Sequence, residues 1–88
     1  MAFAVFLHPK AAKALEKIEK SVSLRIKEKL ANLKEDPEIG KPLKYTNFYS
    51  LRISDYRAIY EIEREKNRVV ILFIGHRKKV YDDFSKIF

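Results

Sequence analysis

Hydrophobic residues recur along this chain with two different periods, and the change of period separates a helical part from a strand-rich part. From Pro9 to Pro37 apolar residues return every three or four positions among lysines and glutamates, which predicts amphipathic helices. Pro9 suits the first turn of the first helix, which should span about three turns. Ser21 is the expected N-cap of the second helix, which Asp36 and Pro37 end. The residues expected to face the core are Ala11, Ala14 or Leu15, Ile18, Val22, Ile26, Leu30 and Leu33.

In residues 49–62 the period becomes two, which predicts β-strands with two distinct faces. Ser54 and Asp55 interrupt the alternation and form the expected turn of a hairpin. Residues 69–74 are apolar on both faces, so this last strand should be the central and most buried one. Residues 3–7 are a short apolar run and form the expected first strand.

The order of these segments predicts the fold class. It reads β-α-α-β-β-β-α, with a short C-terminal helix that starts near Lys78. The two N-terminal helices are joined by a connection so short that they should form an antiparallel hairpin. We therefore expect an α+β fold in a single domain of residues 1–88. Its sheet should be twisted, mainly antiparallel and four-stranded, with the helical hairpin on one face.

Composition and charge narrow the possible functions. The formal net charge of +7 favours a polyanionic partner such as nucleic acid, or an acidic protein that masks the charge. The absence of cysteine excludes disulfides and thiolate catalysis, and two histidines give no metal-ligand cluster. No apolar run approaches the roughly 20 residues of a membrane span, and the N-terminal segment lacks the pattern of a signal peptide. We expect a cytoplasmic protein without a cofactor and without a membrane partner.

Two arginines within the predicted strands are the first candidates for ligand binding or catalysis. Arg52 and Arg57 lie on the phase opposite to the apolar residues of the hairpin, so they should be neighbours on the face away from the helices. Two adjacent like charges are unfavourable unless an anion lies between them, and guanidinium groups bind phosphate in a bidentate manner. The alternative is that each arginine pairs with a carboxylate of Asp55, Glu61 or Glu63.

A cationic run follows directly on the last strand. Arg77 could stabilise charge that develops on a phosphate, and His76 is of the residue type most often used for acid–base catalysis. Lys78 and Lys79 could bind phosphate, although a solvated charge run is the simpler interpretation. Tyr81 could stack on a base or hydrogen-bond to a phosphate, with core packing as its alternative.

Two motifs of this C-terminal half resemble a known family. The chain reads YRAIYEI over residues 56–62 and GHR, followed by VY, over residues 75–81. In this order and at this separation they resemble the RelE/ParE superfamily, the toxins of bacterial and archaeal toxin–antitoxin pairs. The resemblance implies an endoribonuclease that cuts mRNA in the ribosomal A site by attack of a 2′-hydroxyl on its own 3′-phosphate, which inhibits translation. It also implies that Arg57 stabilises the charge of the phosphate, that Arg77 acts as an acid or as a charge stabiliser, and that Tyr81 orients the substrate or stacks on it.

The chain departs from the family on the strand before the YR motif, where the RelE proteins carry lysines that help to activate the nucleophile. Phe48 and Ser50 stand at those positions. The general base is therefore unassigned, with Lys44 and His76 as candidates. Two other functions stay open: inhibition of DNA gyrase, as in the ParE branch, and a toxin whose remaining role is to bind its antitoxin and operator DNA.

The resemblance also implies the partners. They are a RelB-like antitoxin, the ribosome with its mRNA, and operator DNA reached through the toxin–antitoxin complex. The antitoxin should be acidic and should carry an amphipathic helix. We expect this helix to dock in an apolar groove and to displace or cover the C-terminal helix, because that helix is short and ends on the apolar pair Ile87 and Phe88.

Overall fold

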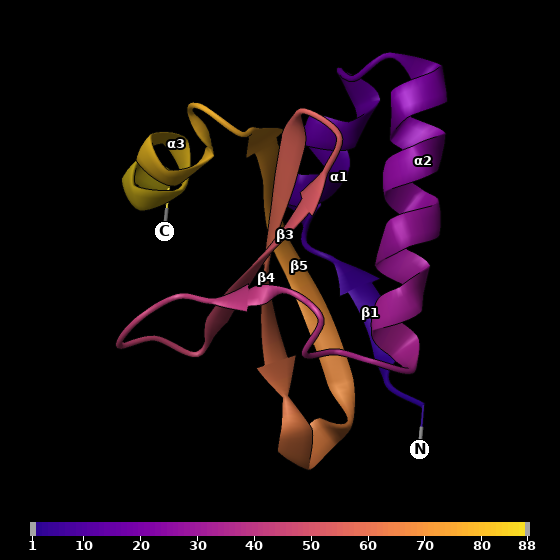
Figure 1. Ribbon diagram of the computed structural model, residues 1–88, viewed down its shortest axis with the longest axis vertical. Coiled ribbons are helices and arrows are strands. Elements are labelled where there is room, and N and C mark those ends of the chain that lie inside the picture. The colour runs from indigo at the N-terminus through magenta and orange to yellow at the C-terminus, as the bar shows by residue number, and fades with distance from the viewer. Residues whose placement is uncertain (1, 88) are drawn as a thin grey trace.

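The computed structural model describes residues 2–87 and shows a twisted β-sheet with helices on both faces (Figure 1). Helices α1 and α2 lie on one side of the sheet and α3 lies on the other. The strands are β1 (Ala4–Leu7), β2 (Lys41–Pro42), β3 (Phe48–Ile53), β4 (Tyr56–Glu63) and β5 (Arg68–His76). The helices are α1 (Pro9–Glu16), α2 (Lys20–Ala31) and α3 (Val80–Ile87), with 3-10 turns at Asn32–Lys34 and Arg64–Lys66.

The strands pair in the order β1-β5-β4-β3-β2, with β1 parallel to β5 and the other pairs antiparallel. The predicted α+β class and the mainly antiparallel sheet are confirmed. The expected count of four strands is wrong, because the stretch before β3 contributes the two-residue edge strand β2. Pro42 has no N–H to donate and keeps this strand short, so it leaves no periodic pattern in the sequence. The expected central strand is also different, because β4 is the middle strand and β5 lies beside it.

The helical hairpin forms as predicted, but its boundaries differ. Helix α1 has eight residues, about two turns instead of three. Helix α2 begins at Lys20 with Glu19 at the N-cap, so the expectation that Ser21 is the N-cap is wrong. The Ser21 hydroxyl instead donates to Glu19 Oε1 at 3.0 Å. The helix ends at Ala31, and a 3-10 turn carries the chain on toward Pro37.

Two apolar clusters cover the two faces of the sheet. The larger one, on the face of α1 and α2, contains every residue that was predicted to face inward from the helices, fully or partly buried. The smaller one, under α3, consists of Ile59, Val80 and Phe84 with Leu43, Phe48, Leu72 and Phe73 around them. The hairpin turn at Ser54 and Asp55 is confirmed by the pairing of Ile53 with Tyr56. The apolar phase of the hairpin therefore faces the helices, and the alternate phase faces α3.

A buried tyrosine fixes the irregular stretch between the helices and the hairpin. The Tyr60 hydroxyl donates to the Pro37 carbonyl at 2.6 Å and accepts from the Gly40 N–H at 3.0 Å. Burial raises the pKa of Tyr60 above its ordinary value. These two bonds hold the chain against the sheet just before β2, so that β2 lies beside β3.

Candidate functional site

Arg52 and Arg57 are direct cross-strand partners in the β3–β4 hairpin, as the alternation predicted. They lie on the phase of the strands that faces α3. Within residues 2–87 neither arginine forms an ion pair with a carboxylate. Of the carboxylates considered as alternatives, Glu63 pairs with Arg68, and Asp55 lies near a different arginine. No acidic side chain within residues 2–87 neutralises either guanidinium group, and Arg52 Nε instead donates to the Ser54 carbonyl at 3.2 Å.

A buried hydroxyl joins Arg57 to helix α3. Arg57 Nη1 donates to Ser50 Oγ at 3.1 Å, and the Tyr81 hydroxyl donates to the same oxygen at 3.1 Å. Ser50 is only 1% exposed, whereas Tyr81 is 43% exposed and Arg57 is half-buried. Arg57, Ser50 and Tyr81 form what we call the arginine cluster. Sequence reasoning named two of its members and missed Ser50, although this serine shares the phase of Arg52.

Lys41 is a second residue that sequence reasoning missed. It pairs with Ser50 across β2 and β3, and paired residues of antiparallel strands project from the same face. Its side chain is exposed. The face that carries the arginine cluster therefore gathers three cations, from Lys41, Arg52 and Arg57. An anion with several acceptor oxygens, such as a phosphate diester, is a ligand that this cationic face could bind.

Arg77 lies at the end of the same sheet, next to the hairpin turn. Its backbone N–H donates to the Asp55 carbonyl at 2.8 Å, and its Nε lies 3.7 Å from Asp55 Oδ1. Both side chains of this pair are well exposed, so the attraction between them is weak. The structure places Arg77 two residues beyond Gly75, the cross-strand partner of Arg57. It does not show a contact between the two arginines.

The other predicted site residues lie apart from the cluster. His76 contacts the Tyr56 ring edge-on, with 5.8 Å between the ring centroids, and Tyr56 packs against the core under α1 and α2. His76 Nδ1 also accepts from the Lys78 N–H at 3.3 Å. His76 therefore lies on the opposite face of the sheet from Arg57. The remaining predicted cations are exposed on loops: Lys44, Lys78 and Lys79.

At the far end of the hairpin, cations and carboxylates do neutralise each other. Arg68 donates to Glu63 and thereby lowers the pKa of that carboxyl group. Glu38 accepts from Arg64 and raises the pKa of its guanidinium group. No group of three or more potential metal ligands occurs within the described residues. The unbalanced positive charge of the sheet is thus on the face of the arginine cluster.

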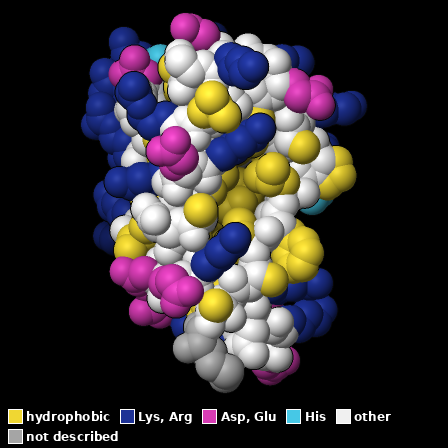
Figure 2. All heavy atoms as spheres, turned by 90° about the vertical axis from the view of Figure 1, so that its right-hand side faces the viewer, with side chains coloured by type: hydrophobic (Ala, Val, Ile, Leu, Met, Phe, Trp, Pro, Cys, Tyr) yellow, Lys and Arg dark blue, Asp and Glu magenta, His cyan; other side chains and the backbone are white. Residues whose placement is uncertain are grey.

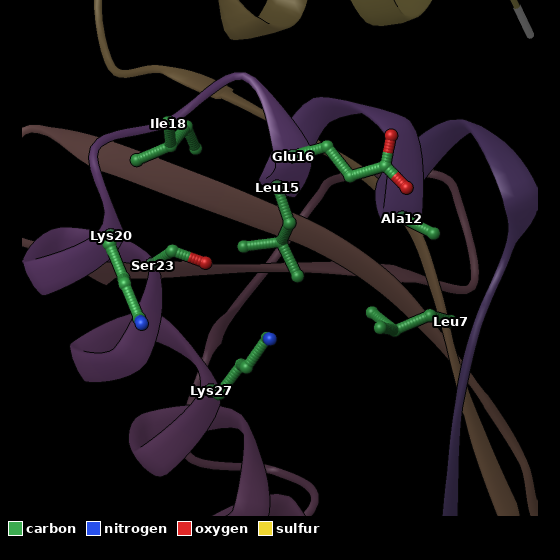
Figure 3. A pocket seen from close by; sticks show the side chains of 8 residues that line it. All are labelled: Leu7, Ala12, Leu15, Glu16, Ile18, Lys20, Ser23 and Lys27. Atoms are coloured by element: carbon green, nitrogen blue, oxygen red, sulfur yellow. The ribbon is translucent and has the colours of Figure 1, made fainter.

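A groove between β1 and the helical hairpin is a second candidate binding surface. Two hollows of about 360 and 200 Å³ share Leu7 and Lys27 in their linings. Figure 2 shows apolar side chains at the bottom of a hollow on this face, with Lys or Arg side chains beside it. In Figure 3, Leu7 and Leu15 point into the pocket and the amine of Lys27 is directed toward them. Lys20, Lys27 and Lys34 follow α2 and its extension at seven-residue spacing, and together they form the groove rim.

The outer edge of β1 borders this groove. Ala4 and His8 donate their N–H groups toward β5, to Asn67 and Ile71. Because backbone groups alternate along a strand, the N–H groups of Val5 and Leu7 point to the open edge. No helix within residues 2–87 has the length and apolar composition needed to span a bilayer. In general, an apolar groove beside an unpaired strand edge can accommodate an extended segment of another protein.

Comparisons with known proteins place the fold among toxins. The family model that describes the ParE toxin of the type II toxin–antitoxin system parDE matches residues 5–81. The structure is similar to the toxin–antitoxin complex RelBE2 of Mycobacterium tuberculosis, with 30% sequence identity over 88% of this chain and 100% of that one and a TM-score of 0.80. The archaeal RelE–RelB complex of Pyrococcus horikoshii is 27% identical over 91% of this chain and 100% of that one, with a TM-score of 0.77.

A mutant of the Escherichia coli toxin RelE in the free state gives a similar result. It is 29% identical over 100% of this chain and 99% of that one, with a TM-score of 0.81. No curated protein matches the chain in sequence.

Proposed function

The chain belongs to the RelE/ParE superfamily of toxins of type II toxin–antitoxin systems, and we propose that it is an endoribonuclease that cleaves mRNA in the ribosomal A site. RelE-family toxins are endoribonucleases. The observation that carries the proposal is the arginine cluster, in which Arg57 and Tyr81 converge on one oxygen and no carboxylate neutralises the guanidinium group. Such a pair of donors suits an oxygen of a phosphate whose charge grows in the transition state.

In the proposed reaction, the 2′-oxygen of a nucleotide forms a bond to its own 3′-phosphorus while the bond to the 5′-oxygen breaks. The products are a cyclic phosphate and a 5′-hydroxyl. Arg57 would stabilise the equatorial oxygens, and Arg77, at the end of the same sheet, would stabilise the negative charge on the leaving 5′-oxygen, which takes a proton from water to become the 5′-hydroxyl. Lys41 would bring an amine beside Ser50, on the strand face where related toxins carry lysines, and is the best-placed group to accept the 2′-hydroxyl proton.

The direct test is cleavage of mRNA on ribosomes programmed with a defined codon in the A site. We expect cuts confined to the A-site codon, and a loss of about 100-fold or more in rate for Arg57→Ala. Arg64→Ala is the matched control, because this arginine pairs with Glu38 at the far end of the hairpin. Absence of cleavage by the wild type, or equal activity of Arg57→Ala, would refute the proposal.

Inhibition of DNA gyrase is the second candidate, and the match to the ParE toxin model favours it. The positions occupied by Phe48 and Ser50 support the same reading, because neither residue can act as a base. Phe48 instead packs edge-on against Phe84, with 5.4 Å between the ring centroids. A supercoiling assay with purified gyrase separates the candidates, since a gyrase inhibitor should act there without ribosomes and should leave mRNA intact.

The partner that we propose for the groove is an acidic segment of the cognate antitoxin, which would also carry the complex to operator DNA. The known structures of related toxins include complexes with RelB antitoxins. In this chain the groove has an apolar floor and three rim lysines, with Glu16 as the single acid among its lining residues. The open edge of β1 adds backbone donors and acceptors that a strand of the antitoxin could pair with.

This docking place differs from the one that the sequence suggested, where the antitoxin helix displaces or covers the C-terminal helix. That expectation rested on the terminal apolar pair, and Phe88 and the side chain of Ile87 lie outside the described part of the structure. Leu7→Asp would place a charge in the floor of the groove and should weaken antitoxin binding by about 100-fold. Leu24→Asp, at an exposed apolar position on α2 outside the lining of the groove, is the matched control. Equal affinities of the two variants would refute the groove as the antitoxin site.

A further inference from the structure

The loop between β2 and β3 carries the most exposed aromatic side chain of the described residues. Tyr45 has a relative exposure of 103%, so its ring packs against nothing in the chain. Its backbone lies in the left-handed region, with φ of 63°. This conformation is unfavourable for a residue with a Cβ atom, and tyrosine has no local hydrogen bond that compensates for it. Folding alone gives no reason for a tyrosine at this position.

The loop that presents Tyr45 is held in place on both sides. Leu43 and Phe48 pack with the apolar cluster under α3, and the Leu43 N–H donates to the Phe48 carbonyl at 2.9 Å. Thr46 ties the loop internally, because its hydroxyl donates to the Leu43 carbonyl at 2.8 Å and accepts from the Phe48 N–H at 3.1 Å. In Figure 1 the loop projects to the same side of the sheet as α3. The exposed ring thus stands on an anchored support on the side of the arginine cluster.

The charge around Tyr45 favours one class of ligand. Residues 40–47 contain Lys41 and Lys44 and no acidic residue. Lys41 is the cross-strand neighbour of Ser50, so cations connect the loop with Arg57. A ligand that crosses this surface meets positive charge along its path and a free aromatic face at its end. A single-stranded nucleic acid combines a phosphate backbone with flat bases that stack on such a face.

We propose that Tyr45 is a base-stacking residue, which binds a nucleotide of a single-stranded RNA whose backbone lies over Lys41 and Arg57. The inference deepens the proposed ribonuclease function and rests on it for the choice of RNA. It adds a contact outside the arginine cluster, at the tip of the β2–β3 loop. The stacked base would lie beyond the reacting phosphate and would help to fix the strand across the site.

The exposure and the backbone of Tyr45 give the proposal a distinctive signature. Tyr45→Asn removes the ring and replaces tyrosine by a residue that tolerates left-handed backbone better. This variant should therefore unfold at the same or higher denaturant concentration than the wild type, while it binds RNA more weakly. A residue with a structural role would lose stability instead. A variant that loses RNA affinity without losing stability therefore indicates a base-stacking role of Tyr45, whereas a loss of stability indicates a structural role.

The experiment measures fluorescence anisotropy of a labelled single-stranded RNA of about ten nucleotides, titrated with the full chain at low salt. Tyr45→Ala and Tyr45→Asn should weaken binding by about tenfold, in the range known for loss of one base–aromatic stack. Tyr45→Phe keeps the ring and should change the affinity by less than about twofold. Leu24→Ala, which truncates an exposed apolar side chain on α2, is the control and should bind like the wild type.

The inference is overturned if Tyr45→Ala binds the RNA as the wild type does. It is also overturned if Tyr45→Phe loses as much affinity as Tyr45→Ala, since the contact would then use the hydroxyl group. A loss of antitoxin or gyrase affinity in Tyr45→Ala, with RNA affinity unchanged, would assign the ring to a protein interface and reject the proposal. RNA binding that depends on Tyr45 in a protein that cleaves no mRNA on ribosomes would uphold the inference and refute the ribonuclease function.

Discussion

At the scale of single residues, one buried hydroxyl decides how Arg57 and Tyr81 are held. Among residues 2–87, Ser50→Ala removes the one side-chain acceptor that either of them has. We expect the free energy of unfolding to fall by about 1–2 kcal/mol, because water can replace only part of the two lost bonds. Amide hydrogen exchange in α3 should become faster, since Tyr81 ties this helix to β3. Ser21→Ala, which removes an exposed hydroxyl on α2, is the control, and equal exchange in both variants would contradict the expectation.

Tyr60 gives the clearest pH dependence. Its pKa is raised mainly by burial, so the folded state holds the proton more tightly than the unfolded chain. The resulting stability is complete below the ordinary tyrosine pKa and is lost as the pH rises from about 10 toward the raised value. Tyr60→Phe should cost about 1–3 kcal/mol at pH near 7, because the Pro37 carbonyl and the Gly40 N–H lose their partner.

Urea unfolding of the wild type and of Tyr60→Phe at neutral and alkaline pH measures both effects. The advantage of the wild type should shrink above about pH 10. All other groups are the same in both proteins, so their contributions cancel in the difference. Tyr45→Phe serves as control, because the exposed Tyr45 hydroxyl makes no contact that folding requires. If the difference in free energy of unfolding between the wild type and Tyr60→Phe stays constant with pH, burial does not raise the pKa of Tyr60.

The residues of the site were predictable only as far as they depend on local alternation. Arg52 and Arg57 follow the period of the hairpin, which correctly placed them side by side. Ser50 gains its role from Tyr81, which lies 31 positions away and arrives with α3. An uninterrupted alternation along β5 would place His76 on the wrong face of the sheet, because β5 is irregular opposite Ile59 and Tyr60. Such an irregularity shifts the phase by one residue, and the local sequence contains no pattern that predicts it.

At the scale of elements, β2 depends on a close approach that only glycine allows. A Cβ atom at Gly40 would lie 2.6 Å from the Tyr60 hydroxyl oxygen and 3.0 Å from the Ser50 carbonyl oxygen. Gly40→Ala should therefore push the chain away from the sheet and cost about 1–3 kcal/mol of stability. The amides next to β2 should exchange faster in consequence. The strands β3 and β4 have alternating patterns and β5 has a continuous apolar run, so these three were predictable, whereas β2 depends on this tertiary contact and was not.

Gly75→Ala is the matched comparison for this substitution. Its Cβ would meet the side chains of Phe73 and Val80 at 3.1 and 3.3 Å, and these can move by a few tenths of an ångström. We expect a smaller loss of stability than for Gly40→Ala, measured by urea denaturation of both variants. If Gly75→Ala loses more stability than Gly40→Ala, the chain before β2 can move away from the sheet at little cost, and the two hydrogen bonds of the Tyr60 hydroxyl contribute little stability.

At the scale of the whole molecule, the net charge of +7 should affect how fast the antitoxin associates, whereas the position of the charges should affect how long it stays bound. If opposite charges drive the encounter, the association rate should fall as salt rises, and a flat salt response would contradict this. Replacing the rim lysines by Gln (Lys20→Gln, Lys27→Gln and Lys34→Gln) removes three positive charges from the groove. Replacing Lys13, Lys29 and Lys66 by Gln removes the same number from exposed positions outside its lining.

Both triple variants should associate more slowly than the wild type, because both lower the long-range attraction. Only the rim variant should also dissociate faster, since charges at a binding surface contribute to the bound state as well as to the encounter. Surface plasmon resonance with the immobilised antitoxin over a series of salt concentrations resolves the two rates. If the two variants have the same dissociation rate, the net charge of the molecule governs capture, and the groove rim has no special part in holding the antitoxin.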